Sequence, residues 1–214
     1  MTRLIDISLA ISSSSLAPPH ADFTHDVSPI VTTAEHGVGV SRLSVTTHTG
    51  THVDPPSHFV VGGASVDQLP LERFYGEAYV AELPRWDGLI GPAELDGLEI
   101  PPGTTRLLLK TGNSEFWHRD DLTWPEQYAA VSPDGADWIA EHGIELVGID
   151  FLGIEPPGNG AGHPTHHRLL SQGVIVIEGL DLYEVDPGSY LLIALPLRVE
   201  DGDGAPLRAA LIKA

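Results

Sequence analysis

The run HTGTHVDPPSH, residues 48–58, is the stretch around which this chain is organised. It contains the imidazoles of His48, His52 and His58 and the carboxylate of Asp54. All of these occupy even positions, so an extended backbone would direct them to one face. Such a group on one face predicts a metal site with its own acid/base residue.

The same run contains the spacing H-x-x-x-H, which on a helix would place His48 and His52 one turn apart. Its composition opposes a helix, because Gly50, Pro55 and Pro56 break helices and the β-branched residues between them favour strands. A straight strand would separate the two histidines by roughly 13 Å, too far for ligands of one ion. We therefore expect an extended path kinked at Gly50. A polar strand edge whose groups hydrogen-bond one another is the alternative interpretation.

The bulk composition fits one folded unit. With 214 residues, 42% of them hydrophobic, the chain is long enough for one buried core, so we expect a single domain over residues 1–214. No apolar run is long enough to span a bilayer, and the first residues lack the layout of a signal peptide, which predicts a cytoplasmic protein. Without cysteine, a metal must be held by His, Asp, Glu or backbone oxygens.

The charge excludes some partners. The net charge of -19 makes nucleic acid or an anionic membrane surface an unfavourable partner, because phosphates repel such a field. The basic residues are scattered singly, so no basic patch offsets this repulsion. Solubility explains the acidity, and the functional alternative is a site that draws in metal ions and neutral or cationic small-molecule substrates.

The apolar pattern predicts a strand-rich chain. Strands are expected at residues 4–9, 38–47, 78–83, 105–110, 144–151, 174–177, 189–197 and 207–212. Short helices are expected at 66–75, 92–95, 134–142 and 165–172, the last capped by Thr165 and closed by Gly173. Residues 12–25 and 153–162 are too rich in serine, proline or glycine for either. This inventory indicates a β-rich α/β or α+β domain.

A second polar group occurs late in the chain. Glu178 directly follows the β-branched run Val174–Ile177, which predicts a strand buried on both faces, and buried carboxylates are normally paired or metal-bound. His166 stands at the start of the predicted helix beside that strand. A salt-bridged Glu178 and a surface His166 explain the same pattern, so these residues alone leave both interpretations open.

Two other groups have less specific patterns. The aromatic residues Phe116, Trp117, Trp124 and Tyr128 predict a small cluster under a long loop, with a substrate-pocket wall as the alternative. The remaining isolated histidines receive no functional assignment: His20, His25, His36, His118 and His142.

The run at 48–58 resembles the H-x-G-T-H-x-D-x-P-x-H signature of the cyclase family of metal-dependent hydrolases, which includes bacterial kynurenine formamidases and isatin hydrolases. Similar segments occur at residues 6–8, 40–44, 69–74, 111–113, 147–150, 166–170 and 178–180. The resemblance implies a swivelling β/β/α fold, a homodimer or homotetramer, and zinc or manganese bound as one or two ions.

Carried over by position, the resemblance also implies roles. His48, His52 and Asp54 match the ligands of the first metal, and Asp54 bridging to His166 and Glu178 matches the second. His58 matches the catalytic acid/base. A divalent ion lowers the pKa of bound water to about 7 and stabilises an oxyanion. His58 would take the water proton and pass it to the leaving nitrogen of an amide.

Two loops differ from the family pattern. Where kynurenine formamidases carry an aromatic residue in a W-P-G-D context, this chain reads APPHAD at 17–22, and residues 151–155 lack the usual serine-containing form. These differences predict rearranged substrate contacts and argue against N-formylkynurenine. We expect a metal-dependent hydrolase of a cyclic amide or aryl formamide. A lactone hydrolase or lyase on the same metal, or an inactive metal- or ligand-binding homologue, are the alternatives.

Overall fold

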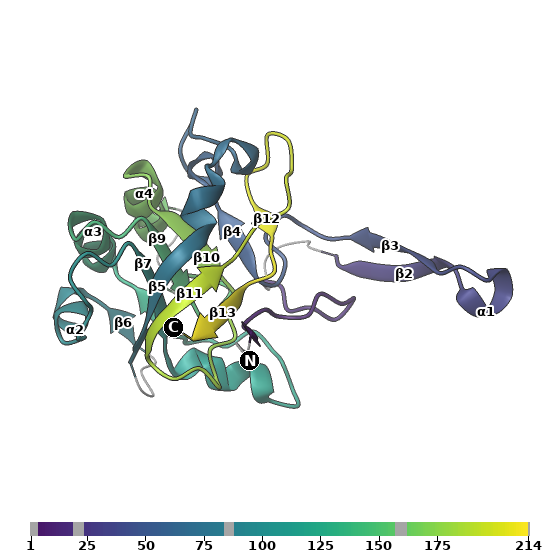
Figure 1. Ribbon diagram of the computed structural model, residues 1–214, viewed down its shortest axis with the longest axis horizontal. Coiled ribbons are helices and arrows are strands. Elements are labelled where there is room, and N and C mark those ends of the chain that lie inside the picture. Colours follow the sequence, from purple (N-terminus) through teal and green to yellow (C-terminus); the bar gives the residue numbers. More distant parts are fainter. Residues whose placement is uncertain (1–3, 19–23, 84–87, 157–161, 214) are drawn as a thin grey trace.

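The computed structural model describes residues 4–18, 24–83, 88–156 and 162–213, and these form a β-rich mixed α/β fold. Among them, nine strands make one curled sheet in the order β1-β13-β11-β5-β7-β9-β10-β4-β12 (Figure 1). Their bounds are β1 Leu4–Asp6, β4 His52–Asp54, β5 Tyr75–Glu82, β7 Arg106–Lys110, β9 Leu146–Ile149, β10 Ile175–Glu178, β11 Gly188–Ile193, β12 Ala205–Pro206 and β13 Ala210–Lys213. The predicted fold class is confirmed.

The middle of this sheet is parallel and its flanks are antiparallel. Strands β5, β7, β9 and β10 run parallel, whereas β4 and β12 on one side and β11, β13 and β1 on the other pair antiparallel. A separate parallel pair joins β6 Leu89–Ile90 to β8 Ala130–Val131. Parallel strands are normally buried on both faces, and β9 and β10 are buried throughout.

Each face of the sheet carries its own apolar cluster. The helices α2 Pro92–Asp96, α3 Pro133–Glu141 and α4 Pro164–Ser171 lie on one side of the sheet, where Leu107 and Leu109 of β7 face them (Figure 1). Leu108 belongs to the opposite cluster. In β10, Val176 faces the helices while Ile175 and Ile177 face away. The alternation of strand side chains thus fills both cores.

The helix predictions were correct in part. Ser132 caps α3, its side chain accepting a hydrogen bond from the Gly135 N–H at 3.0 Å. The helix predicted at 66–75 is wrong: the 3₁₀ helices η2 Val66–Gln68 and η3 Leu71–Phe74 replace it. Pro70 separates them, because proline cannot donate the hydrogen bond that a continuous helix needs there. Further 3₁₀ turns are η1 Pro56–His58 and η4 Gly112–His118.

The predicted cap of α4 is also wrong. Thr165 lies inside the helix, and its hydroxyl donates to the Val131 carbonyl at 2.9 Å, so tertiary packing takes the group that would have capped. The N-cap position is His163, whose backbone has φ 38°. Gly173 follows the helix with φ 76°, as predicted for the terminating glycine.

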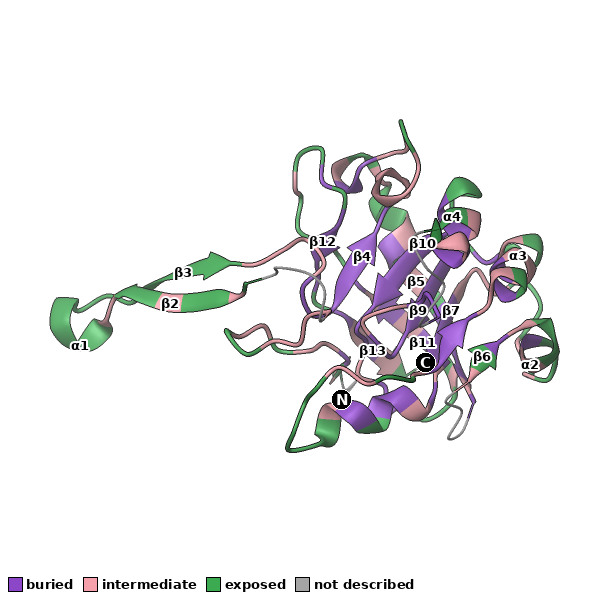
Figure 2. Cartoon of the chain, turned by 180° about the vertical axis from the view of Figure 1, so that it is seen from behind, coloured by how far each residue is buried: buried purple, intermediate pink, exposed green. Residues whose placement is uncertain are grey.

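A hairpin arm extends away from the body. Strands β2 Asp26–Val31 and β3 Val40–Ser44 pair with each other, and α1 Thr33–His36 lies at the tip (Figure 1). The strand predicted at 38–47 is confirmed over Val40–Ser44, but it pairs with β2 and not with the body sheet. Figure 2 shows the arm almost entirely exposed, in contrast to the buried body strands.

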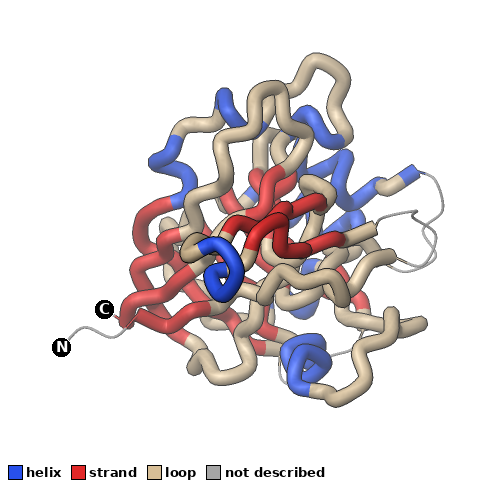
Figure 3. The backbone as a smooth tube through the Cα atoms, turned by 90° about the vertical axis from the view of Figure 1, so that its right-hand side faces the viewer, coloured by secondary structure: helices blue, strands red, loops and turns tan. Residues whose placement is uncertain are grey.

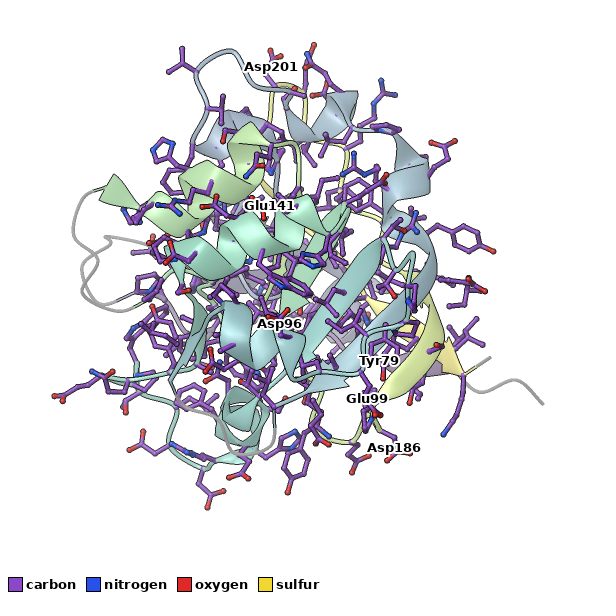
Figure 4. The ribbon with its side chains drawn as sticks, turned by 90° about the vertical axis from the view of Figure 1, so that its left-hand side faces the viewer. Tyr79, Asp96, Glu99, Glu141, Asp186 and Asp201 are labelled. Atoms are coloured by element: carbon purple, nitrogen blue, oxygen red, sulfur yellow. The ribbon has the colours of Figure 1, made fainter. Side chains whose placement is uncertain are left out.

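The helices are short, and acidic side chains lie on several parts of the surface. The view from the arm's side shows how short the helical segments are (Figure 3). In the view from the opposite side, Asp96, Glu141, Asp186 and Asp201 lie on separate elements, so the negative charge is spread over the molecule (Figure 4). In the described part of the chain, every helix is too short or too polar to cross a bilayer. Residues 19–22 of the early loop, including His20, and 157–161 of the glycine-rich loop lie outside the described residues.

Candidate metal centre

The register of one strand pair assembles half of the site. In the antiparallel pair β4–β10, His52 lies opposite Glu178 and Asp54 lies opposite Val176. Val53 packs in the cluster on the face away from the helices, so His52 and Asp54 point toward the helix side. Glu178 shares that face because Val176, two residues before it, packs there. Nε2 of His52 is 3.5 Å from Oε2 of Glu178.

His48 reaches the site from the turn that precedes β4. Gly50 has φ 64°, a conformation that glycine adopts without a steric cost, and it turns the chain between His48 and His52. Nδ1 of His48 is consequently 2.8 Å from Oδ1 of Asp54. The kink predicted at Gly50 is confirmed. Residues 47–51 form a turn, however, and only 52–54 are strand, so the strand is shorter than expected.

His58 follows a different path from the one predicted. It ends the 3₁₀ helix η1 and is not on an extended chain, so the parity argument is wrong for this residue. Pro55 and Pro56 cause the difference, since they end the strand and favour the first turn of a helix. The turn still brings its ring over His48, with centroids 4.0 Å apart and an interplanar angle of 29°.

The helix α4 supplies the other half. His166 is buried, and its Nε2 lies 3.6 Å from Oδ2 of Asp54 and 3.3 Å from Oε1 of Glu178. Asp54 therefore stands between two sets of side chains. Among the described residues, His48, His52 and Asp54 form one set and Asp54, His166 and Glu178 another, each with potential ligand atoms within 4.8 Å of one another. The structure brings together all six residues singled out from the sequence.

These residues fit a divalent ion. Asp54 and Glu178 are only 1% and 4% exposed, and buried carboxylates are normally paired or metal-bound. Nε2 of His48 is buried without a hydrogen-bond partner among the described residues. Gly204 lies close to that ring, and a Cβ there would come within 2.6 Å of its Cε1. Imidazole nitrogens and carboxylate oxygens are donors that divalent metals bind.

Burial and the neighbouring charges set the protonation of this group. Burial acts to lower the pKa of His166, but its hydrogen bonds to Asp54, Glu155 and Glu178 hold that pKa well above the ordinary value. Burial acts to raise the pKa of Asp54, and the hydrogen bonds from His166 and His48 hold it well below the ordinary value. Burial lowers the pKa of His58 to about 4. His58 is therefore neutral at neutral pH and able to accept a proton.

A cavity of about 360 Å³ opens onto the group. One wall is the polar cluster itself. The other is largely apolar, and its side chains come from the early loop, the segment after η1 and two later loops: Leu16, Ala17, Pro18, Phe59, Trp124 and Leu152. Trp124 thus lines the pocket, as the alternative interpretation held, and it also packs around Phe151 in the predicted aromatic cluster: Phe116, Trp117, Trp124 and Tyr128. The pocket suits a small molecule with a flat apolar part.

Sequence reasoning missed some residues of this cavity. His25 was treated as isolated, yet it lines the pocket, with Nε2 3.0 Å from the Thr49 hydroxyl. Glu155 and His163 line it too. Glu155 follows the single apolar residue Ile154, a much weaker signal of a buried carboxylate than the four-residue apolar run before Glu178. No spacing rule connects His25 or His163 to the run at 48–58.

Comparisons with known proteins identify relatives that match almost the whole chain. The family model described as "Putative cyclase" matches residues 5–156. A kynurenine formamidase of Salinibacter ruber is 35% identical over 209 residues, covering 97% of this chain and 96% of that protein. A solved structure described as a potential metal-dependent hydrolase with cyclase activity has a TM-score of 0.85 and 32% identity, covering 100% and 99% of the two chains. Isatin hydrolase A from Labrenzia aggregata has a TM-score of 0.83 and 25% identity, covering 99% and 93%.

Proposed function

This chain belongs to the cyclase family of metal-dependent hydrolases, and on that premise we propose that it hydrolyses a small amide, either a cyclic amide or an aryl formamide. The observation that carries the proposal is the position of Asp54. Its Oδ1 faces His48 and His52 while its Oδ2 faces His166, so one carboxylate serves two sets of donors. The kynurenine formamidase and isatin hydrolase relatives support the substrate class.

Each of the two sets of donor side chains would bind one metal ion. His48, His52 and Asp54 would hold one ion, and Asp54, His166 and Glu178 a second, with zinc or manganese as the metal. An ion bound there supplies Lewis acidity and lowers the pKa of water toward neutrality. The rest of the chemistry belongs to the side chains of the pocket.

His58 is the proposed acid/base. Its burial keeps the ring neutral at neutral pH, so it can take a proton from the attacking water as the water oxygen bonds to the amide carbon. The same proton then goes to the leaving nitrogen as the C–N bond breaks. Stacking on His48 holds the ring beside the ligands. The apolar wall, with Phe59 and Trp124, would hold the ring of the substrate.

The test begins with metal-free protein reloaded with zinc or manganese. We expect the reloaded wild type to hydrolyse isatin or a formanilide-type amide, and His58→Ala to keep its metal while losing roughly 10²- to 10⁴-fold in turnover. His142→Ala is the matched control, because His142 is exposed and stacks on Trp138 away from the pocket. A wild type that takes up no divalent ion would end the proposal. Metal uptake with turnover of lactones alone would favour the ester alternative.

We also propose that the protein is a homo-oligomer in which the arm contacts a second copy. The arm exposes Val27, Ile30, Val38, Val40 and Leu43. A lone two-stranded hairpin is marginally stable in water, and clustered exposed apolar residues mark contact surfaces. The arm begins and ends beside His25 and Thr46, which line the pocket, so a partner that fixes the arm would also steady the pocket rim.

The oligomer is tested by light scattering on purified protein. Replacing Val40 and Leu43 by Ser should reduce the mass toward one chain. Leu71→Ser, at a residue 61% exposed on the body, should leave the mass unchanged. A wild-type mass of one chain would contradict the proposal. The cytoplasmic location and the single domain over 1–214 remain predictions from the sequence.

A further inference from the structure

His166 presents its two ring nitrogens to different partners. Nε2 faces Asp54 and Glu178, and Nδ1 lies 3.0 Å from Oε2 of Glu155. An imidazole nitrogen can bind a metal only without a proton, so the ring must carry its proton on Nδ1 for Nε2 to act as ligand. A proton on Nδ1 needs an acceptor in a buried position. Glu155 is that acceptor.

Glu155 is itself held in place. It is 7% exposed, and its Oε2 accepts the main-chain N–H of His166 at 3.1 Å while its Oε1 accepts that of Thr165 at 3.4 Å. These N–H groups belong to the first turn of α4, where the helix dipole also favours a negative charge. One carboxylate thus fixes both the backbone and the ring of His166.

The other histidines are oriented by weaker or different partners. Nδ1 of His52 lies 2.8 Å from the Gly50 carbonyl oxygen, a neutral acceptor. Nδ1 of His48 lies against Asp54, which is within the site itself. A carboxylate behind a ligating imidazole raises the basicity of the ligand more than a carbonyl does, and removal of such partners typically costs roughly 10- to 100-fold in metal affinity.

We propose that Glu155 is a positioning residue that fixes the tautomer and orientation of His166 and so sets the affinity of the second metal position. The inference rests on the proposed function, because it concerns the same metal site. It assigns Glu155 no contact with the reacting atoms. The position set by Asp54, His166 and Glu178 is the one that depends on it, and the position set by His48, His52 and Asp54 is independent of it.

The test compares Glu155→Gln, Glu155→Asp and the surface control Glu184→Gln. Purified proteins are stripped of metal, reloaded with zinc against a competing chelator, and assayed for zinc bound per chain; cobalt-loaded samples give an absorption spectrum. We expect Glu155→Gln to bind the second equivalent roughly 10- to 100-fold more weakly, with an altered cobalt spectrum. Glu155→Asp, which keeps the charge, should recover part of the affinity, and Glu184→Gln should match the wild type.

Further readouts separate positioning from other roles. If Glu155 positions His166, kcat falls with KM nearly unchanged, whereas a substrate contact would raise KM and leave the zinc ratio intact, which would overturn the proposal. Wild-type zinc affinity and cobalt spectrum in Glu155→Gln would overturn it as well. Thermal unfolding of the metal-free proteins checks that each variant is folded. If Glu155→Gln is unfolded, Glu155→Asp is used for the zinc and cobalt measurements instead.

The variant His163→Ala tests the remaining alternative, in which Glu155 is itself a metal ligand. Glu155, His163 and His166 also have potential ligand atoms within 4.8 Å of one another. Loss of a zinc equivalent in His163→Ala would mean that this trio holds an ion itself, and the positioning role would be wrong. Failure of the proposed function is distinguishable, because it would appear in the wild type as absent zinc uptake or absent turnover. Failure of this inference alone would appear only in the Glu155 and His163 variants.

Discussion

Glu178 lies directly opposite His52 in the antiparallel pair of β10 and β4, although the two residues are 126 positions apart in the sequence; the Oε2–Nε2 distance is 3.5 Å. This pairing makes the buried end of β10 part of the candidate metal site. The carboxylate also accepts the Ile154 N–H at 2.6 Å, so it is fixed from both sides. The following predictions test the relationships that build the site.

The first prediction concerns Glu178 itself. Glu178→Gln keeps the size of the side chain but removes its charge, so the ion held with Asp54 and His166 should be lost or weakened while the first set stays intact. Mass spectrometry of metal-reloaded protein under native conditions should give a lower metal-to-protein ratio than in the wild type. An unchanged ratio would remove Glu178 from the site.

Gly204 allows a test that retains every candidate ligand residue and changes only the position of one ring. A Cβ at Gly204 would lie 2.6 Å from Cε1 and 2.9 Å from Nε2 of His48, so Gly204→Ala must push that ring away. We expect a loss of about 10-fold or more in affinity for the first metal equivalent, measured by chelator competition. Gly162→Ala is the control, since a Cβ there meets nothing within 4 Å among the described residues. Equal metal affinities in the two variants would contradict a close contact between Gly204 and the His48 ring.

The next prediction concerns the contribution of Asp150 to the stability of the fold. This fully buried carboxylate directly follows β9 and accepts hydrogen bonds from the main-chain and hydroxyl groups of Thr111 and Ser114. Asp150→Asn would turn an N–H₂ group toward these donors, which should lower the free energy of unfolding by about 1–3 kcal/mol. Urea denaturation measures this. Asp186→Asn, at an exposed carboxylate paired with Lys213, should change little.

The stability of the fold is expected to depend on pH through the pair formed by Asp6 of β1 and Arg208, just before β13. The Arg208 guanidinium beside Asp6 holds the pKa of that carboxyl below its ordinary range. Because the folded-state pKa is lowered, this pair stabilises the fold above the unfolded pKa of about 3.9, and the contribution is lost as the pH falls through the folded value. In Arg208→Gln, carboxyl NMR should report a higher pKa for Asp6. The same pKa in both proteins would exclude the pairing in solution.

Much of this could be predicted from the chain because the signals are local. The apolar run Leu107–Leu109 within 105–110 and the unbroken apolar run at 174–177 predicted buried strands that the structure contains as β7 and β10. Gly50 predicted the kink because glycine alone adopts a positive φ cheaply. Two of the errors are also local in cause: Pro70 split a predicted helix, and the prolines before His58 replaced an extended path by a 3₁₀ turn. The wrong cap at Thr165 has a tertiary cause, since its hydroxyl bonds to Val131.

The sequence by itself determined a β-rich fold and the residue types of a metal site at 48–58, since periodicity, breakers and donor chemistry act over a few residues. Only the tertiary structure decided which distant groups complete that site. The β4–β10 register brings Glu178 to His52, the packing of α4 brings His166 to Asp54, and loops add His25 and Glu155. Such contacts depend on how strands and helices pack across the whole chain, and no local pattern encodes them.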